Sequence, residues 1–180
     1  MVTAGTGGNG GGGLCAVRHL ANWNGNVRFC LSNANRLTSA TAFQRQILFS
    51  THAKQITVSE LEFLKPDLII DALIGYGLTS GPQGKVRDLI VRIGDIRSAV
   101  LSLDIPSGVD ATTGHHPGEF VKADRTLTLA LPKTGLVSES AGELFLADIG
   151  IPRGVYQRLG LDYRSPFDGR PVIRLEHLTS

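Results

Sequence analysis

The stretch that decides the fold is VTAGTGGNGGGGL, residues 2–14. The residues from Val2 to Gly5 have the composition of a short strand. The run from Gly7 to Gly13 predicts a glycine-rich loop, and residues 14–22 have the spacing of an amphipathic helix. A strand, a glycine-rich turn and a helix in this order are typical of the first unit of a doubly wound α/β sheet.

Within this stretch, Gly5, Gly7 and Gly10 satisfy the spacing G-x-G-x-x-G. That spacing lets the backbone approach a phosphate and directs helix N-terminal amides at it. A flexible turn without a ligand is the alternative. In dehydrogenases an acidic residue follows about 20 positions later and binds the ribose. Here the second strand ends in Leu31-Ser32-Asn33 without an acid, so that binding mode is not supported.

The rest of the chain alternates β-branched runs with helical stretches, which predicts an α/β three-layer sandwich with a Rossmann-like, mostly parallel sheet and helices on both faces. We expect one domain over residues 1–180, with 153–180 as a tail packing on its surface. The first strand begins at the initiator Met, so we expect that an N-terminal segment is truncated. Expected strands cover 27–31, 56–58, 68–73, 99–103, 125–131 and 143–147, and expected helices cover 14–22, 38–49, 59–65 (capped by Ser59 with Glu62) and 85–93.

Composition limits the classes of function. The chain has 42% hydrophobic and 19% charged residues, as a globular domain does, and no apolar run reaches the roughly 20 residues of a membrane span. Cys15 and Cys30 sit in apolar segments, which predicts buried reduced thiols. No acidic residue precedes Glu60, although five basic ones do. This basic third suits a phosphate-bearing ligand, or it is a solvated face; it is too sparse for nucleic acid.

Two aspartates end buried strands. Asp71 begins DALIGYGLTSG, residues 71–81, and Asp104 lies in LDIPSGVD, residues 103–110. Open α/β sheets bind ligands at strand ends of this polarity. Asp104 in a partly desolvated crevice could act as a general acid or base, whereas Asp71 could bind a ligand or only brace its loop.

The loops also collect hard oxygen donors. Asn9, Asp71, Asp104 and Ser107 share one predicted sheet edge and could hold a monovalent or divalent hard cation. No His/Cys cluster suggests a transition metal, and the pair His115-His116 in a Gly/Pro turn is expected to be exposed. No nucleophile elbow surrounds Ser107, which disfavours an acyl hydrolase.

In this order, the motifs at residues 5–14, 71–77 and 103–110 resemble those of the NAD(P)H-hydrate epimerase family. Later segments that are similar to the family include Pro132 to Leu136 and Ala147 to Pro152. The similarity runs from about Val2 to Pro152. Gly8 and Gly12 stand where the family usually has Asn and Asp, and the helical segment that precedes the loop in the family is absent.

The resemblance implies epimerisation of the R and S forms of hydrated NAD(P)H (NADHX and NADPHX). It implies a cytoplasmic homodimer working with a separate NAD(P)H-hydrate dehydratase, with no membrane or nucleic-acid partner. Asp104 would transfer the proton, and a potassium ion would be held by Asn9, Asp71 and Ser107. The alternative is a catalytically impaired dinucleotide- or RNA-binding scaffold of the same fold. The implied substrate-binding residues are Gly8, Asn9, Gly10, Gly11, Gly12, Gly75, Tyr76, Gly77, Leu78, Thr79, Ser80, Gly81 and Asp104.

Overall fold

The computed structural model describes residues 1–176, apart from the side chain of Ser138. It forms an eight-stranded sheet in the order β3-β2-β1-β4-β5-β6-β7-β8. All neighbouring pairs are parallel except β7 with β8. The predicted mostly parallel α/β sheet is confirmed. The strands are β1 Val2–Ala4, β2 Arg28–Leu31, β3 Lys54–Ile56, β4 Leu68–Ala72, β5 Ala99–Leu103, β6 Arg125–Leu129, β7 Glu143–Ala147 and β8 Val172–Leu175.

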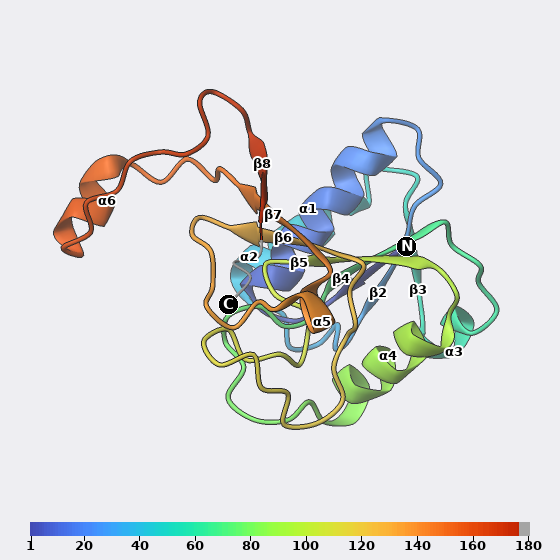
Figure 1. Cartoon of the computed structure of the whole chain (residues 1–180). Coiled ribbons are helices and arrows are strands. Elements are labelled where there is room, and N and C mark those ends of the chain that lie inside the picture. The colour runs from blue at the N-terminus through green and yellow to red at the C-terminus, as the bar shows by residue number, and fades with distance from the viewer. Residues whose placement is uncertain (177–180) are drawn as a thin grey trace.

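Helices cover both faces of the sheet (Figure 1). On one face, α1 (Gly8–Asn22) and α2 (Ser39–Leu48) bury a core that includes Leu14, Val17 and Leu48. On the other, α3 (Val58–Leu61) and α4 (Gly84–Asp95) bury Leu61 and Leu89 against the sheet. Strand residues alternate between these cores because successive side chains point to opposite faces. The three-layer prediction therefore holds.

The glycine run is not the loop that the sequence predicts. Helix α1 begins at Gly8, so six of its fifteen residues come before Leu14. Glycine is a poor helix former, but tertiary packing overrides that preference here. A Cβ on Gly10 would lie 2.0 Å from the carbonyl oxygen of Gly5, and one on Gly13 would lie 2.5 Å from the Cβ of Ala72. The glycines let the first turns of α1 lie directly against β1 and β4.

The predicted cap of the third helix was wrong by two residues. Thr57, not Ser59, is the N-cap of the short helix α3, and Glu60, not Glu62, completes the capping box. The Thr57 amide donates to Glu60 Oε2 at 2.8 Å, and the Glu60 amide donates to Thr57 Oγ1 at 3.4 Å. The same Ser/Thr-x-x-Glu spacing occurs at both places in the sequence. The preceding strand, β3, ends at Ile56 rather than at Val58, and this leaves Thr57 to start the helix.

The C-terminal segment contributes the last strand of the sheet. Strand β8 adds to β7 as an antiparallel edge strand, with Leu144 paired to Leu175 and Ala147 paired to Val172. Helix α6 (Arg153–Arg158) precedes it and stands away from the sheet (Figure 1). The short helix α5 (Ser138–Ala141) comes just before β7. The predicted tail also includes residues 177–180, which lie outside the described residues.

Both cysteines are free, as predicted; Cys30 is buried, but Cys15 is only half-buried. Among the described helices, none combines the length and the apolar character that a membrane span requires.

Candidate active site

A cavity of about 680 Å³ opens at the carboxyl edge of the sheet. It lies where β1, β4 and β5 end, and these three strands are neighbours in the sheet. The glycine segment, the Asp71 loop and the Asp104 loop therefore meet at one edge, as predicted. The residues that line the cavity are Thr6, Gly7, Gly8, Asn9, Gly12, Ala16, Leu73, Ile74, Gly75, Tyr76, Gly77, Leu103, Asp104 and Leu129.

The first wall is the N-terminal turn of α1. Asn9 donates a side-chain hydrogen bond to the Leu103 carbonyl at 3.1 Å and so connects α1 to the end of β5. Gly8 and Gly12 line the cavity, and a Cβ on either would meet nothing within 4 Å. A side chain at either position would therefore have open space and would not press on packed atoms. Gly10 and Gly11 are buried inside the turn instead.

Asp71 and Ser107 lie side by side beneath the cavity, and both are fully buried. The Ser107 hydroxyl is 2.6 Å from Asp71 Oδ1, and the Ser107 amide donates to Oδ2 at 2.9 Å. Ser102 and the Leu73 amide supply two more hydrogen bonds to the same carboxyl group. Burial raises the pKa of Asp71, although the hydrogen bonds from Ser107, Leu73 and Ser102 act in the opposite direction.

The donor chemistry around Asp71 fits a monovalent hard cation. Within residues 1–176, Asp71 takes part in no ion pair, and a buried carboxylate is costly unless a positive charge or hydrogen bonds compensate it. One positive charge would balance this single carboxylate. The described residues contain no cluster of three or more His, Cys, Asp or Glu side chains that could hold a metal ion.

Asn9 is the third predicted metal ligand, and it is not hydrogen-bonded to Asp71 or Ser107 among the described residues. Asn9 lies next to Gly75 of the Asp71 loop, since a Cβ on Gly75 would be 3.2 Å from Asn9 Cβ. The residue before it, Ile74, donates its amide to Ser107 Oγ at 2.8 Å. The three predicted ligands therefore surround one short segment of the Asp71 loop.

Asp104 follows β5 directly and faces the same cavity. Its backbone has a φ of 66°, in the left-handed region that non-glycine residues rarely adopt. Its Oδ1 lies 2.6 Å from Lys133 Nζ, and the side chains of Asp104 and Lys133 are only 13% and 14% exposed. Residues held in such conformations cluster at active sites, where the surrounding structure fixes them.

The loop from Gly75 to Gly81 is divided between two hollows. Gly75, Tyr76 and Gly77 line the main cavity. Leu78, Thr79 and Ser80 line a neighbouring hollow of about 240 Å³ together with Asp110 and His115. Gly81 lines neither; a Cβ there would lie 2.9 Å from the Pro117 carbonyl oxygen. His115 and His116 are both exposed, as predicted.

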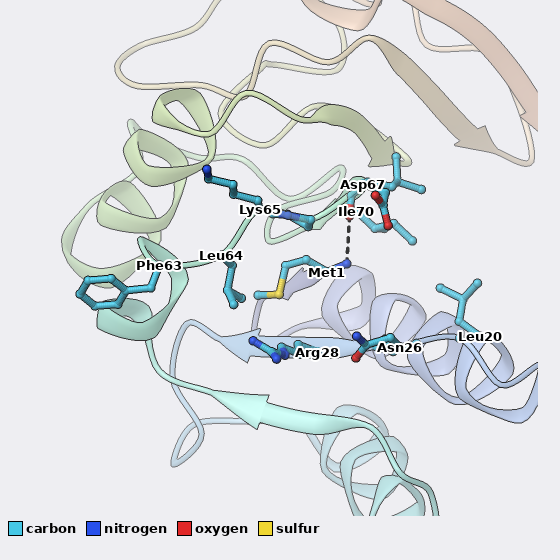
Figure 2. A pocket seen from close by; sticks show the side chains of 13 residues that line it. Met1, Leu20, Asn26, Arg28, Phe63, Leu64, Lys65, Asp67 and Ile70 are labelled. Atoms are coloured by element: carbon cyan, nitrogen blue, oxygen red, sulfur yellow. Dashed lines mark hydrogen bonds between the residues drawn. The ribbon is translucent and has the colours of Figure 1, made fainter.

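A further hollow of about 560 Å³ lies at the opposite, amino edge of the sheet (Figure 2). The amino group of Met1 donates to the Leu68 carbonyl there at 2.9 Å, and burial lowers its pKa while nearby Asp67 acts in the opposite direction. Figure 2 shows side chains of Phe63, Leu64 and Arg28 around Met1. None of the oxygen donors discussed above belongs to this hollow, so the candidate site is the cavity at the carboxyl edge.

Sequence reasoning gave no role to Lys133, Thr128 or Ser102. Lys133 follows β6 by four positions in the segment Pro132 to Leu136, which the family resemblance already included. Ser102 and Thr128 lie inside strands, where alternation alone predicts buried packing. The signal that could have indicated this role is that Lys133 follows β6, and β6 pairs with β5, the strand directly before Asp104.

Comparison of this chain with known proteins identifies its family. Residues 1–135 match the family model described as "YjeF-related protein N-terminus". A protein named NAD(P)H-hydrate epimerase from Dehalogenimonas lykanthroporepellens is 47% identical over 97% of this chain and 72% of its own length. Another protein of that name, from Truepera radiovictrix, is 32% identical over 90% of this chain and 74% of its own length.

Longer relatives and a solved structure agree. A bifunctional NAD(P)H-hydrate repair enzyme from Salinibacter ruber is 35% identical over 88% of this chain, which corresponds to 33% of the longer protein. The crystal structure of the yeast protein YNL200c superimposes with a TM-score of 0.82 over 97% of this chain and 76% of that one, at 21% identity, and supports the fold alone. The chain therefore belongs to the family of YjeF-related N-terminal domains, the NAD(P)H-hydrate epimerase family.

Proposed function

We propose that this protein is an NAD(P)H-hydrate epimerase, which interconverts the R and S forms of hydrated NADH or NADPH. The observation that carries the proposal is Asp104, held in a left-handed conformation on the wall of the 680 Å³ cavity between two glycine-rich segments. The relatives at 47% and 32% identity bear the same name.

The reaction requires proton transfer rather than redox chemistry. In the hydrate, C6 of the nicotinamide ring carries a hydroxyl group beside the ring nitrogen. Opening of the ring moves the hydroxyl proton to a base, converts the C–O bond to a carbonyl and leaves the electron pair of the C6–N bond on nitrogen, which then takes a proton. Reclosure on the other face of the carbonyl reverses each step and inverts C6. No atom or electron is gained or lost overall.

Asp104 is the group in the cavity that suits both proton transfers. A carboxylate can accept the hydroxyl proton and deliver it to nitrogen, and then act in reverse during reclosure. Leu103 and Leu129 beside it supply an apolar wall, which limits the access of water to the open form. Only one acid/base group is needed because the proton that leaves oxygen is the one that nitrogen receives.

The dinucleotide is expected to bind over the two glycine-rich segments. The first turn of α1 lines the cavity, and a helix N-terminus favours a phosphate. The absence of side chains at Gly7, Gly8 and Gly12 leaves room for close approach. Leu78, Thr79 and Ser80, in the neighbouring hollow, would bind a more distant part of the ligand.

A potassium ion, if bound, would be held by Asn9, Asp71 and Ser107 and would supply fixed positive charge beneath the cavity. In this arrangement Ser107 orients the Asp71 carboxylate, and Asn9 fixes the distance between α1 and β5. We further propose that the protein works as a homodimer beside a dehydratase specific for one epimer. Salinibacter ruber has a bifunctional repair enzyme of which the region similar to this chain is only a third.

The test supplies an equilibrium mixture of hydrate epimers, an excess of a dehydratase specific for the S form, and potassium buffer. The S fraction converts to NADH at once, and further recovery then measures epimerisation. We expect the protein to accelerate this second phase above the spontaneous rate. A scaffold that only binds dinucleotide would give a binding isotherm with NADPH but leave the second phase unchanged, and that result would reject the enzyme assignment.

A further inference from the structure

Lys133 forms the closest ion pair in the described part of the chain, and its partner is Asp104. The ammonium group lies 2.6 Å from Asp104 Oδ1, 2.7 Å from the Leu129 carbonyl and 2.9 Å from Thr128 Oγ1. A lysine ammonium has three donors, and these three acceptors use all of them. Lys133 therefore has no donor left for a ligand, and it does not line the cavity.

The two oxygens of Asp104 are in different surroundings. Oδ1 accepts from Lys133 and, at 3.4 Å, from the Leu129 amide. Among the described residues no hydrogen bond reaches Oδ2, which lies 3.2 Å from where a Cβ on Gly75 would be. Gly75 lines the cavity, so Oδ2 is the oxygen on the ligand side.

The backbone around this pair is also unusual. Asp104 directly follows β5 and has a φ of 66°, and Ala130 follows the neighbouring strand β6 with a φ of 65°. The Asp104 amide donates to the Leu127 carbonyl at 2.8 Å, which ties the two strand ends together. Two of the four non-glycine residues with positive φ in the described part therefore lie beside the ion pair.

We propose that Lys133 is a positioning residue for the epimerisation: it fixes Oδ1 of Asp104 and so leaves Oδ2 as the single oxygen that exchanges a proton with the substrate. This inference rests on the proposed function and deepens it. Lys133 fixes Oδ1 without competing for the ligand, because all three of its donors are already used. A misplacement of about 1 Å in a reacting group can cost about 10²-fold in rate.

The experiment compares Lys133→Met with Lys122→Met, which removes an exposed lysine outside the site. We expect Lys133→Met to lower kcat about 10²-fold while KM for the hydrate changes less than about threefold, because Lys133 holds the reacting group and not the substrate. Lys122→Met should keep wild-type values of both. In an Asp104→Asn background, Lys133→Met should cause no further loss, since the two residues act as one unit.

Two additional arms separate positioning from folding. Added propylamine should restore part of kcat to Lys133→Ala, and it should restore nothing when Asp104 is also Asn. If Lys133→Met does not fold at the assay temperature, Thr128→Val decides, because it removes one acceptor of Lys133 and keeps both charges. We then expect kcat to fall about threefold to tenfold with KM unchanged.

A near-wild-type kcat in Lys133→Met would overturn the inference, and so would a near-wild-type kcat in Thr128→Val if Lys133→Met does not fold. In that case Asp104→Asn would still be inactive, and the proposed function would stand. An equal loss in kcat and rise in KM would also overturn it, since that pattern indicates a substrate-binding lysine. A wild-type protein without any turnover would reject the proposed function instead, and this inference with it.

Discussion

At the scale of single residues, the site depends on two aspartates in different environments. Asp71 is fully buried and accepts four hydrogen bonds, from Ser107, Ser102 and Leu73. Asp104 is slightly exposed, borders the cavity and has one oxygen on its ligand side. The first environment suits a structural or cation-binding carboxylate, and the second suits proton transfer.

Asp104→Asn tests the second role. The side chains are nearly equal in volume, so the fold should persist, but the amide cannot cycle a proton. We expect epimerisation to fall by about 10²–10⁴-fold. The measurement is the second phase of NADH recovery in the coupled assay. Circular dichroism and NADPH binding serve as controls, and full activity in a folded Asp104→Asn protein would contradict the assignment.

Cys30 gives a prediction on stability against pH. Burial raises the pKa of the Cys30 thiol from 9.0 to about 11, with Glu60 adding to the rise. Below about pH 9 both folded and unfolded thiols are protonated, so Cys30 makes no difference. Between these two pKa values only the unfolded thiol ionises; unfolding then releases a proton, and stability falls as pH rises.

The check is urea unfolding of wild type and Cys30→Ala at pH 8 and at pH 10.5. The remaining titratable groups are the same in both proteins, so their effects on the free energy of unfolding cancel in the comparison. The stability advantage of wild type over Cys30→Ala should shrink at the higher pH by about 1–2 kcal/mol. A constant difference between the two proteins would show that the thiol ionises equally in both states.

At the scale of elements, the main feature is a helix that starts inside a glycine run. Two kinds of glycine occur in α1: Gly10 and Gly13 lie against Gly5 and Ala72, at the ends of β1 and β4, whereas Gly8 and Gly12 face open space. Thr41 on α2 fixes the start of the helix, since its hydroxyl donates to the Gly7 carbonyl at 2.8 Å. Packing with β1, β4 and α2, rather than helix propensity, therefore decides where α1 begins.

Gly10→Ala and Gly12→Ala should change stability in opposite directions. A Cβ on Gly10 would lie 2.0 Å from the Gly5 carbonyl oxygen, so α1 must move away from β1, at a cost of about 1–3 kcal/mol or more. A Cβ on Gly12 meets nothing within 4 Å, so the better helix propensity of alanine should stabilise the protein by about 0.5–1 kcal/mol. Urea midpoints of the two variants measure this, and equal shifts would contradict the observed packing.

Thr41→Val removes the hydrogen bond between α2 and the glycine segment while keeping the volume of the side chain. The Gly7 carbonyl still accepts from the Gly11 amide at 3.0 Å, so we expect a modest loss of about 0.5–1.5 kcal/mol. Thr41→Ser keeps the hydroxyl and is the matched control. An equal loss in both variants by thermal unfolding would contradict the prediction, because only Thr41→Val removes the hydrogen bond.

At the scale of the whole molecule, strand order assembles the site. Three segments separated by about sixty and thirty residues become neighbours because β4 pairs with β1 and β5 pairs with β4. The predicted cation ligands come from all three segments. Ion binding should therefore stabilise the folded protein and not a fragment of it, because a ligand that binds only the native state raises its stability.

Potassium should raise the thermal midpoint of the protein relative to a tetramethylammonium buffer of equal ionic strength. At a potassium concentration of 100 times Kd, the added stability would be about 2.7 kcal/mol. Asp71→Asn removes the only carboxylate among the predicted ligands and should remove most of the potassium effect. Ser59→Ala is the control. The sequence predicted Ser59 as a helix cap, but the structure has Thr57 in that role. An equal response of wild type and Asp71→Asn would exclude Asp71 as a ligand.

The sequence by itself determined the α/β class, the parallel sheet and the approximate bounds of most strands, because alternation and apolar runs are local properties. It also determined that Asp71 and Asp104 lie at strand ends on one edge of the sheet, since parallel strands place their carboxyl ends together. It did not determine that α1 starts at Gly8, that β8 completes the sheet, or that Lys133 holds Asp104. Each of these depends on contacts between segments distant in the chain, and only the tertiary structure decides them. The contacts are the close backbone approach at Gly10, the pairing of β7 with β8, and the pairing of β5 with β6.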